Sequence, residues 1–428
     1  MKKYIIFWLS QSVSQMGSTM TGLSLVLWAY TQTESEMAVS LMTFCNYVPF
    51  IIVSLFAGTF VDRHHKKKVM LLSDSAAALC SLSVLLLWMT GGLQMIHIYV
   101  INFILGFMNA FQQPAAAVAI GRMVPQEELE RVSGLNSFSS SLIAVFAPVL
   151  AAAFYAWGGL KIVLAIDFAT FLFAFSVLLF AVRIPEIKQE QEKKVSAFAG
   201  CKLGFTFLFQ HKGLWYIIIN MAVMNFLSRL TYENILSPMI LARSGNSSFA
   251  FGLVNACIGI GGIAGGVIVS MGKMPKDRIK TIYISAAISF ILGDLVMGLG
   301  RNTFFWCLSG IAASLPIPFL MAAQNVILYE NIPQEIQGRI FAVRNAIQFG
   351  TIPLGILLGG YLAQYVFEPF LMSDALPAVM LQKLVGSGRG SGMAVMFLCT
   401  GVCGGLFCLW VSTRKGLNVY RQKRADIN

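Results

Sequence analysis

The sequence contains few charged residues. Only 12% of its 428 residues are Asp, Glu, Lys or Arg, whereas 57% are hydrophobic. Soluble globular proteins carry about 25% charged residues, so this chain has too little charge to cover a surface that faces water. The composition therefore predicts a lipid bilayer as the solvent, crossed by helices of roughly 20 apolar residues each.

Features of several other protein classes are also missing. The eight cysteines lie almost all within apolar segments, which favours small buried side chains over a disulfide framework. Cys399 and Cys403 share a helix face without His or carboxylate neighbours, so we expect no metal site. No glycine-rich stretch continues into Gly-Lys-Ser/Thr, which argues against a phosphate-binding loop. We expect no cofactor and no enzymatic activity.

The positive charge has a pattern of its own. A net charge of +12 is compatible with a nucleic-acid partner, but the basic residues lie in short connections between apolar segments, as orientation signals do. If the N-terminus is cytoplasmic, 25 of the 31 Lys and Arg residues fall on the cytoplasmic side and only five outside. We predict that both termini are cytoplasmic and that no nucleic acid is bound.

Twelve apolar segments are present, each long enough to span a bilayer as a helix. The first continues past Tyr30, too long for the core of a signal peptide, so we expect it to remain as a span. The predicted spans are 4–30, 38–61, 69–90, 95–121, 134–157, 160–182, 214–241, 249–271, 281–299, 303–328, 342–366 and 392–412.

The chain divides into two halves. A charged stretch at 185–194 follows the sixth span, and an amphipathic helix is expected at 198–209. After the fourth span stands Val124-Pro-Gln-Glu, and Arg131 follows; after the tenth stands Ile332-Pro-Gln-Glu, and Arg339 follows. This repeat indicates duplication of a six-span unit. We predict bundles at 1–183 and 214–428, joined by a linker at 184–213.

A basic turn connects the second and third spans. It reads Gly58-Thr-Phe-Val-Asp62-Arg63, followed by two histidines and then Lys66, Lys67 and Lys68. Asp62 stands at a helix end, where its charge is unfavourable against its own helix dipole, so it gains from a partner helix N-terminus or from Arg63. The charge pattern places this turn on the cytoplasmic side.

Five ionisable residues lie inside the predicted spans, where such residues are costly and often functional. Arg229 and Glu233 are four residues apart: either Glu233 carries a proton beside Arg229, or the two form a fixed ion pair. Asp294 lies near the middle of its span, and the sequence supports a functional role and a packing role equally. Asp74 is expected to support an inner gate, and Asp167 to have a structural or vestibule role.

Polar side chains on the first and fourth spans could line a cavity. Their alternative role is hydrogen bonding between helices, and the sequence leaves both open. The candidates are Gln11, Gln15, Asn102, Asn109, Gln112 and Gln113.

Glycines at small-xxx-small spacing predict close helix contacts. They are Gly261 and Gly265 in the eighth span and Gly355 and Gly359 in the eleventh.

The twelve spans, the linker, the repeat and the basic turn together resemble the major facilitator superfamily over almost the whole chain. The resemblance implies two six-helix bundles in the major facilitator fold. It also implies that Asp62 engages the start of the eleventh span and that the basic residues hold an inner gate shut. The gating motif would be Gly58, Asp62, Arg63, Lys66 and Lys67, and we assign support of the gate to Asp74, Arg131 and Arg339.

A narrower resemblance is to macrolide-efflux-like drug:proton antiporters. It rests on Phe111-Gln-Gln-Pro114-Ala115, Val124-Pro125, Asn136, Gly338-Arg339 and the stretch 367–389. Two positions depart from proton-coupled exporters: Asn102 stands where many carry arginine, and Ala147-Pro148 replaces a Gly-Pro. Our candidates for proton coupling are therefore Glu233, Arg229 and Asp294.

We expect an all-α secondary transporter of the cell membrane, acting as a monomer. It would export amphiphilic small molecules in exchange for protons, by alternating access. Export or import of a siderophore, lipid or metabolite is the alternative substrate class. A scaffold or sensor without transport is the alternative of another kind.

Overall fold

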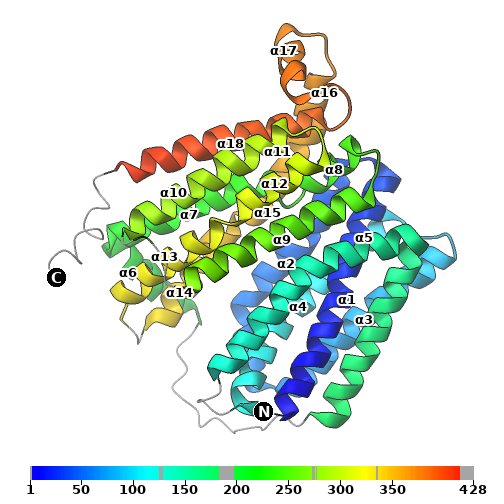
Figure 1. Ribbon diagram of the computed structural model, residues 1–428. Helices are drawn as coiled ribbons and strands as arrows, with labels where there is room; N and C mark the ends of the chain where they lie inside the picture. The colour runs from blue at the N-terminus through cyan, green and yellow to red at the C-terminus, as the bar shows by residue number, and fades with distance from the viewer. Residues whose placement is uncertain are drawn as a thin grey trace. The chain divides into compact units, whose positions relative to one another are not determined.

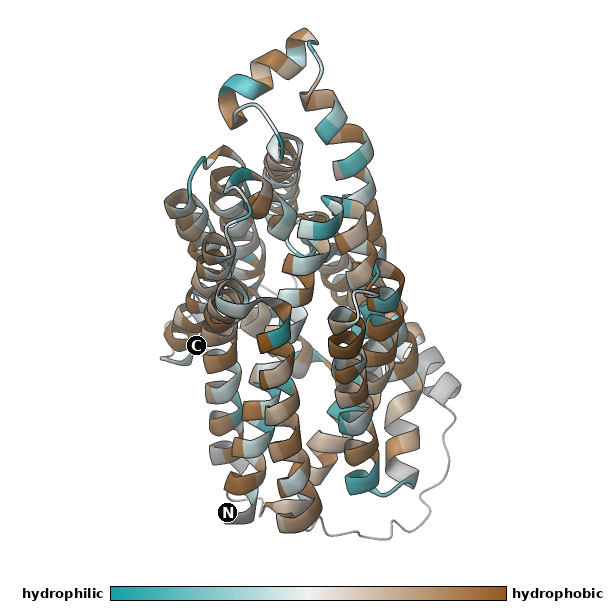
Figure 2. Cartoon of the chain, turned by 90° about the vertical axis from the view of Figure 1, so that its right-hand side faces the viewer, coloured by the Kyte–Doolittle hydropathy of each residue, from teal (hydrophilic) through white to brown (hydrophobic). Residues whose placement is uncertain are grey.

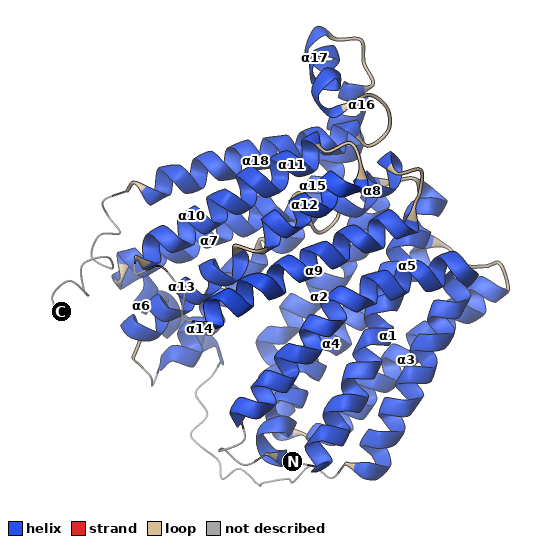
Figure 3. Cartoon of the chain, viewed as in Figure 1, coloured by secondary structure: helices blue, strands red, loops and turns tan. Residues whose placement is uncertain are grey.

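The computed structural model describes residues 2–124, 129–182, 197–271, 275, 277–333 and 336–414. Within these ranges the chain is helical and contains no strand (Figure 3). The chain forms two compact units, Met1–Lys194 and Val195–Asn428.

The first unit consists of long helices, most of which are joined by short connections. Helix α1 packs against α5, α2 packs against α4, and α3 packs against both α4 and α5 (Figure 1). The elements are α1 (Lys2–Thr33), α2 (Glu36–Arg63), α3 (Lys66–Met89), α4 (Met95–Met123), α5 (Leu129–Ser176) and the π-helical turn η2 (Val177–Ala181).

The second unit has shorter and more interrupted helices. In it α9 packs against α12, α10 against α13 and α18, and α7 against α14 and α15. The elements are α6 (Ala197–Gln210), α7 (Lys212–Arg229), α8 (Leu236–Arg243), α9 (Ser248–Ser270), α10 (Arg278–Ile288), η3 (Ser289–Asp294), α11 (Leu295–Leu299), α12 (Thr303–Ser314), α13 (Ile317–Asn331), α14 (Gln337–Gly350), α15 (Ile352–Leu362), η5 (Ala363–Phe367), α16 (Glu368–Leu371), α17 (Leu376–Val385) and α18 (Ser391–Ser412).

All twelve predicted spans coincide with helical segments. Nine helices among the described residues are long and apolar enough to cross a membrane, and the difference from twelve has three causes. The fifth and sixth spans count as one helix, although Gly158 and Gly159 between them are not helical and Gly159 has φ +66°. Helix α1 is too polar to be counted among the nine apolar helices, and the seventh span is interrupted.

Large apolar side chains cover the outside of the helices. Phe180, Trp157, Phe304 and Phe249 are each at least 70% exposed, and apolar residues follow the helices along most of their length (Figure 2). Water would disfavour so much exposed apolar area, whereas lipid accepts it. The polar groups of the backbone are paired inside the helices, as a bilayer requires.

The glycines that predicted close contacts do make them. A Cβ on Gly261 or Gly265 of α9 would collide with the backbone of Ile311 or Leu315 at the end of α12. On α15, Gly355 and Gly359 face the backbone at the end of α7 in the same way. These glycines let helix backbones approach more closely than side chains would allow, which confirms the prediction.

Candidate functional site

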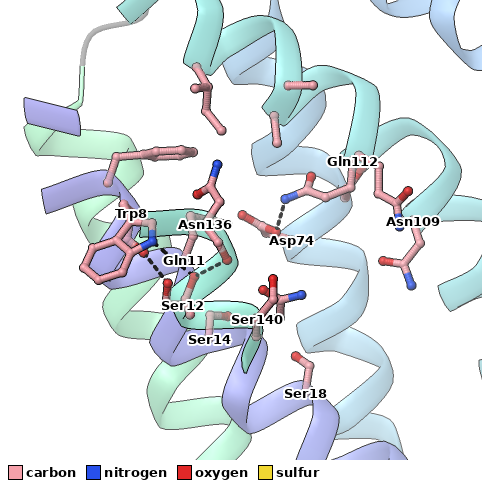
Figure 4. A pocket seen from close by; sticks show the side chains of 18 of the residues that line it. Trp8, Gln11, Ser12, Ser14, Ser18, Asp74, Asn109, Gln112, Asn136 and Ser140 are labelled. Carbon is pink, nitrogen blue, oxygen red and sulfur yellow. Dashed lines mark hydrogen bonds between the residues drawn. The ribbon is translucent and has the colours of Figure 1, made fainter. Parts of the chain in front are cut away.

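A cavity of about 620 Å³ opens among α1, α3, α4 and α5 of the first unit. This volume lies within the range of pockets for drug-sized molecules. The lining is mostly hydroxyl and amide groups, with one carboxylate (Figure 4). Five of the six amides that we predicted as cavity residues line it: Gln11, Gln15, Asn109, Gln112 and Gln113.

Asp74 is part of the cavity wall. Its position in the sequence predicted support of an inner gate, whereas its carboxylate faces the cavity, and Gln112 Nε2 donates to its Oδ1 at 2.8 Å (Figure 4). Among the described lining residues it is the only charged side chain. The cavity therefore has a single acidic side chain within a polar wall.

Tyr4 and Trp8 of α1 also line the cavity, and we did not predict them. Trp8 Nε1 donates to the Leu135 carbonyl at 3.0 Å and to Ser139 Oγ at 3.1 Å, and Tyr4 donates its hydroxyl to Asn136 Oδ1 at 3.0 Å. These bonds fasten α1 to α5. Positions 4, 8, 11, 15 and 18 form one helix face, so the spacing of the predicted Gln11 and Gln15 could have included both aromatics.

Asn102, the sixth predicted amide, lies away from the cavity. Its Nδ2 donates to the Ile98 carbonyl at 2.9 Å, within its own helix, and Asn46 Nδ2 donates to its carbonyl at 3.3 Å. Next to this pair, a Cβ on Gly106 would collide with the Asn46 backbone. Asn102 thus belongs to the close contact between α2 and α4, the alternative that the sequence had left open.

Asp167 joins three helices of the first unit. It is buried, and its two carboxylate oxygens accept hydrogen bonds from Ser18 at 3.1 Å and from Ser81 at 2.7 Å. Ser18 lies on α1, Ser81 on α3 and Asp167 on the second half of α5. A carboxylate whose two oxygens are both occupied by neighbouring hydroxyls acts as a fastening point, in line with the predicted structural role.

Lys67 joins the basic turn to the end of the sixth span. Lys67 Nζ donates to the Leu179 and Val182 carbonyls at 3.0 and 2.7 Å, and Lys66 beside it is buried. These carbonyls end η2, where helix carbonyls have no partner in their own helix. Gly58 lies within α2. Outside the described part of the chain are the side chains of Asp62, Arg63, Arg131 and Arg339, and residues 125–128, 183–196, 272–274, 276 and 334–335.

In the second unit, the seventh span is not one continuous helix. Helix α7 ends at Arg229 and α8 begins at Leu236, with turns between them. Pro238 explains the break, because it has no N–H to donate to the carbonyl of Asn234 and its ring crowds that carbonyl. Arg229 and Glu233 still form an ion pair, now across the start of the break. Both are partly exposed, at 31% and 22%.

Asp294 lies deep in the same unit. It is 1% exposed, ends the π-helical turn η3 and accepts a hydrogen bond from Thr400 of α18 at 2.6 Å. The hydroxyl of Tyr232, from the break in the seventh span, lies beside Gly293. Tyr232 of the break thus approaches the turn that ends at Asp294, and the next residue, Glu233, pairs with Arg229.

A metal centre has no support in the described residues: no group of three or more His, Cys, Asp or Glu side chains there is close enough to hold an ion. The seven cysteines that the structure describes are free. The chemistry of these sites is therefore that of hydrogen bonds, carboxylates and one ion pair.

The chain is similar to known transporters. It is 26% identical to Macrolide efflux protein A of Streptococcus pyogenes over 383 residues, 87% of this chain and 93% of that protein. It is 24% identical to Multidrug efflux pump Tap of Mycolicibacterium fortuitum over 377 residues, 81% of this chain and 86% of that protein. The solved structure of the nucleoside transporter NupG has the same fold, with a TM-score of 0.70, 13% identity and coverage of 97% and 100%.

The family model of the Major Facilitator Superfamily matches residues 7–291. This match covers more than half of the chain, and the helical architecture agrees with it. The chain belongs to the Major Facilitator Superfamily and, within it, is similar to the macrolide efflux proteins.

Proposed function

We propose that this protein exports amphiphilic small molecules across the cell membrane in exchange for protons. The observation that carries the proposal is the polar cavity of the first unit, with Asp74 as its one charge, in a chain similar to macrolide and multidrug efflux proteins. A polar cavity inside a helix bundle has little use in a bilayer unless something occupies it. In transporters of this architecture, alternating access exposes such a site to each side in turn.

Proton coupling is assigned to the second unit. Glu233 is the leading candidate, because it is partly exposed and its partner Arg229 can stabilise its charged form and release it when the break moves. Asp294 is the second candidate: it is deeply buried, and Thr400 donates a hydrogen bond to it. A carboxyl group that takes up a proton during transport needs such a low-polarity setting.

The inner gate is assigned to the basic turn, with both termini in the cytoplasm. The Lys67 contact supports this assignment, since it ties the start of α3 to the end of η2 on the same side of the first unit. Gly58, Asp62, Arg63 and Lys66 would complete the motif, with Arg131 and Arg339 beside it. The protein would act as a monomer, since each chain has its own cavity.

The test is expression in a bacterial strain that lacks its own drug pumps. Cells with the wild-type protein should tolerate higher concentrations of macrolides than cells with the empty vector, and a protonophore should remove the difference. Fluorescent dyes extend the panel to amphiphiles of other shapes. No change for any macrolide or dye, with the protein present in the membrane, would contradict the proposal and favour a metabolite as the substrate.

A further inference from the structure

Three polar atoms of the first-unit cavity are buried and make no hydrogen bond of normal geometry among the described residues, although the Gln11 amide lies close enough to the Asp74 carboxylate to interact with it. They are Gln11 Nε2, Asp74 Oδ2 and Gln112 Oε1. All three residues line the cavity, and Gln11 and Gln112 lie on either side of Asp74 (Figure 4). Buried polar atoms are nearly always paired, so three unpaired ones in one cavity indicate a group that the protein is built to receive.

The orientation of the Gln112 amide follows from its neighbour. A carboxylate only accepts hydrogen bonds, so the amide must turn its NH₂ group toward Asp74 Oδ1, which leaves Gln112 Oε1 facing away. The cavity therefore offers two acceptors, Asp74 Oδ2 and Gln112 Oε1, and one donor, Gln11 Nε2. Asp74 is the one acidic side chain among its described lining residues.

We propose that Gln11, Asp74 and Gln112 bind a protonated amine that carries a hydroxyl or ether oxygen close to its nitrogen. The ammonium group donates to Asp74 Oδ2 and Gln112 Oε1, and the neighbouring oxygen accepts from Gln11 Nε2. This assignment rests on the proposed export function and specifies its substrate class as monocationic amino alcohols and amino ethers with an apolar body.

Other ligand classes satisfy the trio less well. Anions are repelled by Asp74, and no Lys, Arg or His among the described lining residues offsets that charge. A quaternary or phosphonium cation balances the charge but has no N–H for Gln112 Oε1. A neutral alcohol supplies hydrogen bonds without the charge, and hydrogen bonds between charged partners are about twice as strong as neutral ones.

The remaining wall suits the apolar part of such a ligand. Phe7, Trp8, Ala116, Ala117 and Ile120 line the cavity beside the amides. The Trp8 N–H is already bonded to α5, so its ring offers only an apolar surface to a ligand. A bound molecule would thus have one polar end at Asp74 and an apolar body along α1 and α4.

Equilibrium binding to the purified full-length protein in lipid nanodiscs tests the assignment with two probes. Propranolol is a monocationic amphiphile with a hydroxyl near its amine; tetraphenylphosphonium is a cation without N–H groups. Wild-type protein should bind propranolol saturably, and Asp74→Asn should weaken this binding by about tenfold or more. Gln11→Leu and Gln112→Leu should weaken propranolol binding and leave tetraphenylphosphonium binding unchanged.

The controls separate ligand contacts from folding. Asp74→Glu keeps the carboxyl group and should retain part of the affinity. Asp374→Asn changes an exposed residue between α16 and α17 and should match the wild type. Size-exclusion chromatography reports whether each variant is folded; if Asp74→Asn is not, the two glutamine variants carry the test. Absence of wild-type propranolol binding would overturn the assignment. Equal affinity for propranolol in wild type and in the folded variants, as expected if the three atoms hold only water, would overturn it too.

Export is measured separately, as accumulation of a macrolide and of propranolol in pump-deficient cells. Binding that depends on Asp74, without reduced accumulation of either compound, would refute export and leave the assignment standing. Reduced macrolide accumulation, together with propranolol binding that does not depend on Asp74, would refute the assignment and leave export standing.

Discussion

Lys67 Nζ lies 2.7 Å from the carbonyl oxygen of Val182, 115 residues away in the sequence. The second contact, to the Leu179 carbonyl at 3.0 Å, places the ammonium group over the end of η2. A cation at a helix C-terminus is favourable both for its hydrogen bonds and for the helix dipole. The basic turn thus has a structural partner that its position in the sequence did not reveal.

Lys67→Gln should lower the stability of the protein and slow transport. The substitution removes hydrogen bonds from a charged donor, which are worth about 1.5–3 kcal/mol in folded proteins. Thermal unfolding of the detergent-solubilised protein measures the loss. Lys68→Gln is the matched control, because Lys68 is exposed and adjacent, and its unfolding temperature should not change. Equal behaviour of the two variants would remove the structural role of Lys67.

Gly265→Ala and Gly266→Ala should have opposite effects, although the residues are neighbours on α9. A Cβ at Gly265 meets the Leu315 carbonyl, and overpacking of this kind costs about 1–3 kcal/mol. At Gly266 no described atom lies within 4 Å, and alanine is a better helix former by about 1 kcal/mol. Thermal unfolding should rank the proteins Gly266→Ala, wild type, Gly265→Ala, and the reverse order would contradict the packing of α9 against α12 and α13.

Glu233→Gln should abolish uptake driven by a pH gradient in inverted vesicles while substrate exchange without a gradient continues. The reason is that the amide cannot carry a proton, although it fills the same space. Glu330→Gln, an exposed carboxylate of the same unit, is the control and should behave as wild type. Normal pH-driven uptake in Glu233→Gln, with a lowered unfolding temperature, would make Arg229–Glu233 a fixed ion pair instead.

Asp62→Asn should stop export without reducing the amount of protein in the membrane. The carboxylate is expected to hold the gate through a helix N-terminus, an interaction that needs its charge. Export assays and immunoblots of membrane fractions measure the two quantities. Asp374→Asn removes an exposed carboxylate between α16 and α17 and serves as the control. Unchanged export in the Asp62 variant would remove the gating assignment.

The helices and their number were predictable from composition and segment length. Lipid offers no partner for a backbone N–H or carbonyl, so an apolar segment of about 20 residues is compelled to form a helix wherever it lies in the chain. The predicted boundary between the fifth and sixth spans fits the non-helical Gly158 and Gly159, whereas the seventh span, expected as one segment at 214–241, is interrupted after Arg229. The glycines of α9 and α15 predicted close contacts because they leave the backbone bare.

The cavity was predictable only in part. Gln11 and Gln15 share a helix face, so their common direction followed from the helical repeat. The sequence left Asn102 open between the cavity and a helix contact, and support of an inner gate by Asp74 stays a prediction, since depth in the membrane says nothing about which way a side chain points. The Asp74 carboxylate faces α4 and the cavity, whereas the Asn102 side chain donates to the Ile98 carbonyl of its own helix.

The sequence by itself determined that the chain is a bundle of membrane helices, because hydrophobic length and backbone hydrogen bonding are local properties. The tertiary structure decided which polar residues meet. The rotation of each helix about its axis depends on close contacts with its neighbours, such as Gly106 against Asn46, and these contacts bring Gln11, Asp74 and Gln112 into one cavity. Those three side chains come from three different helices, so no spacing along the chain could have grouped them.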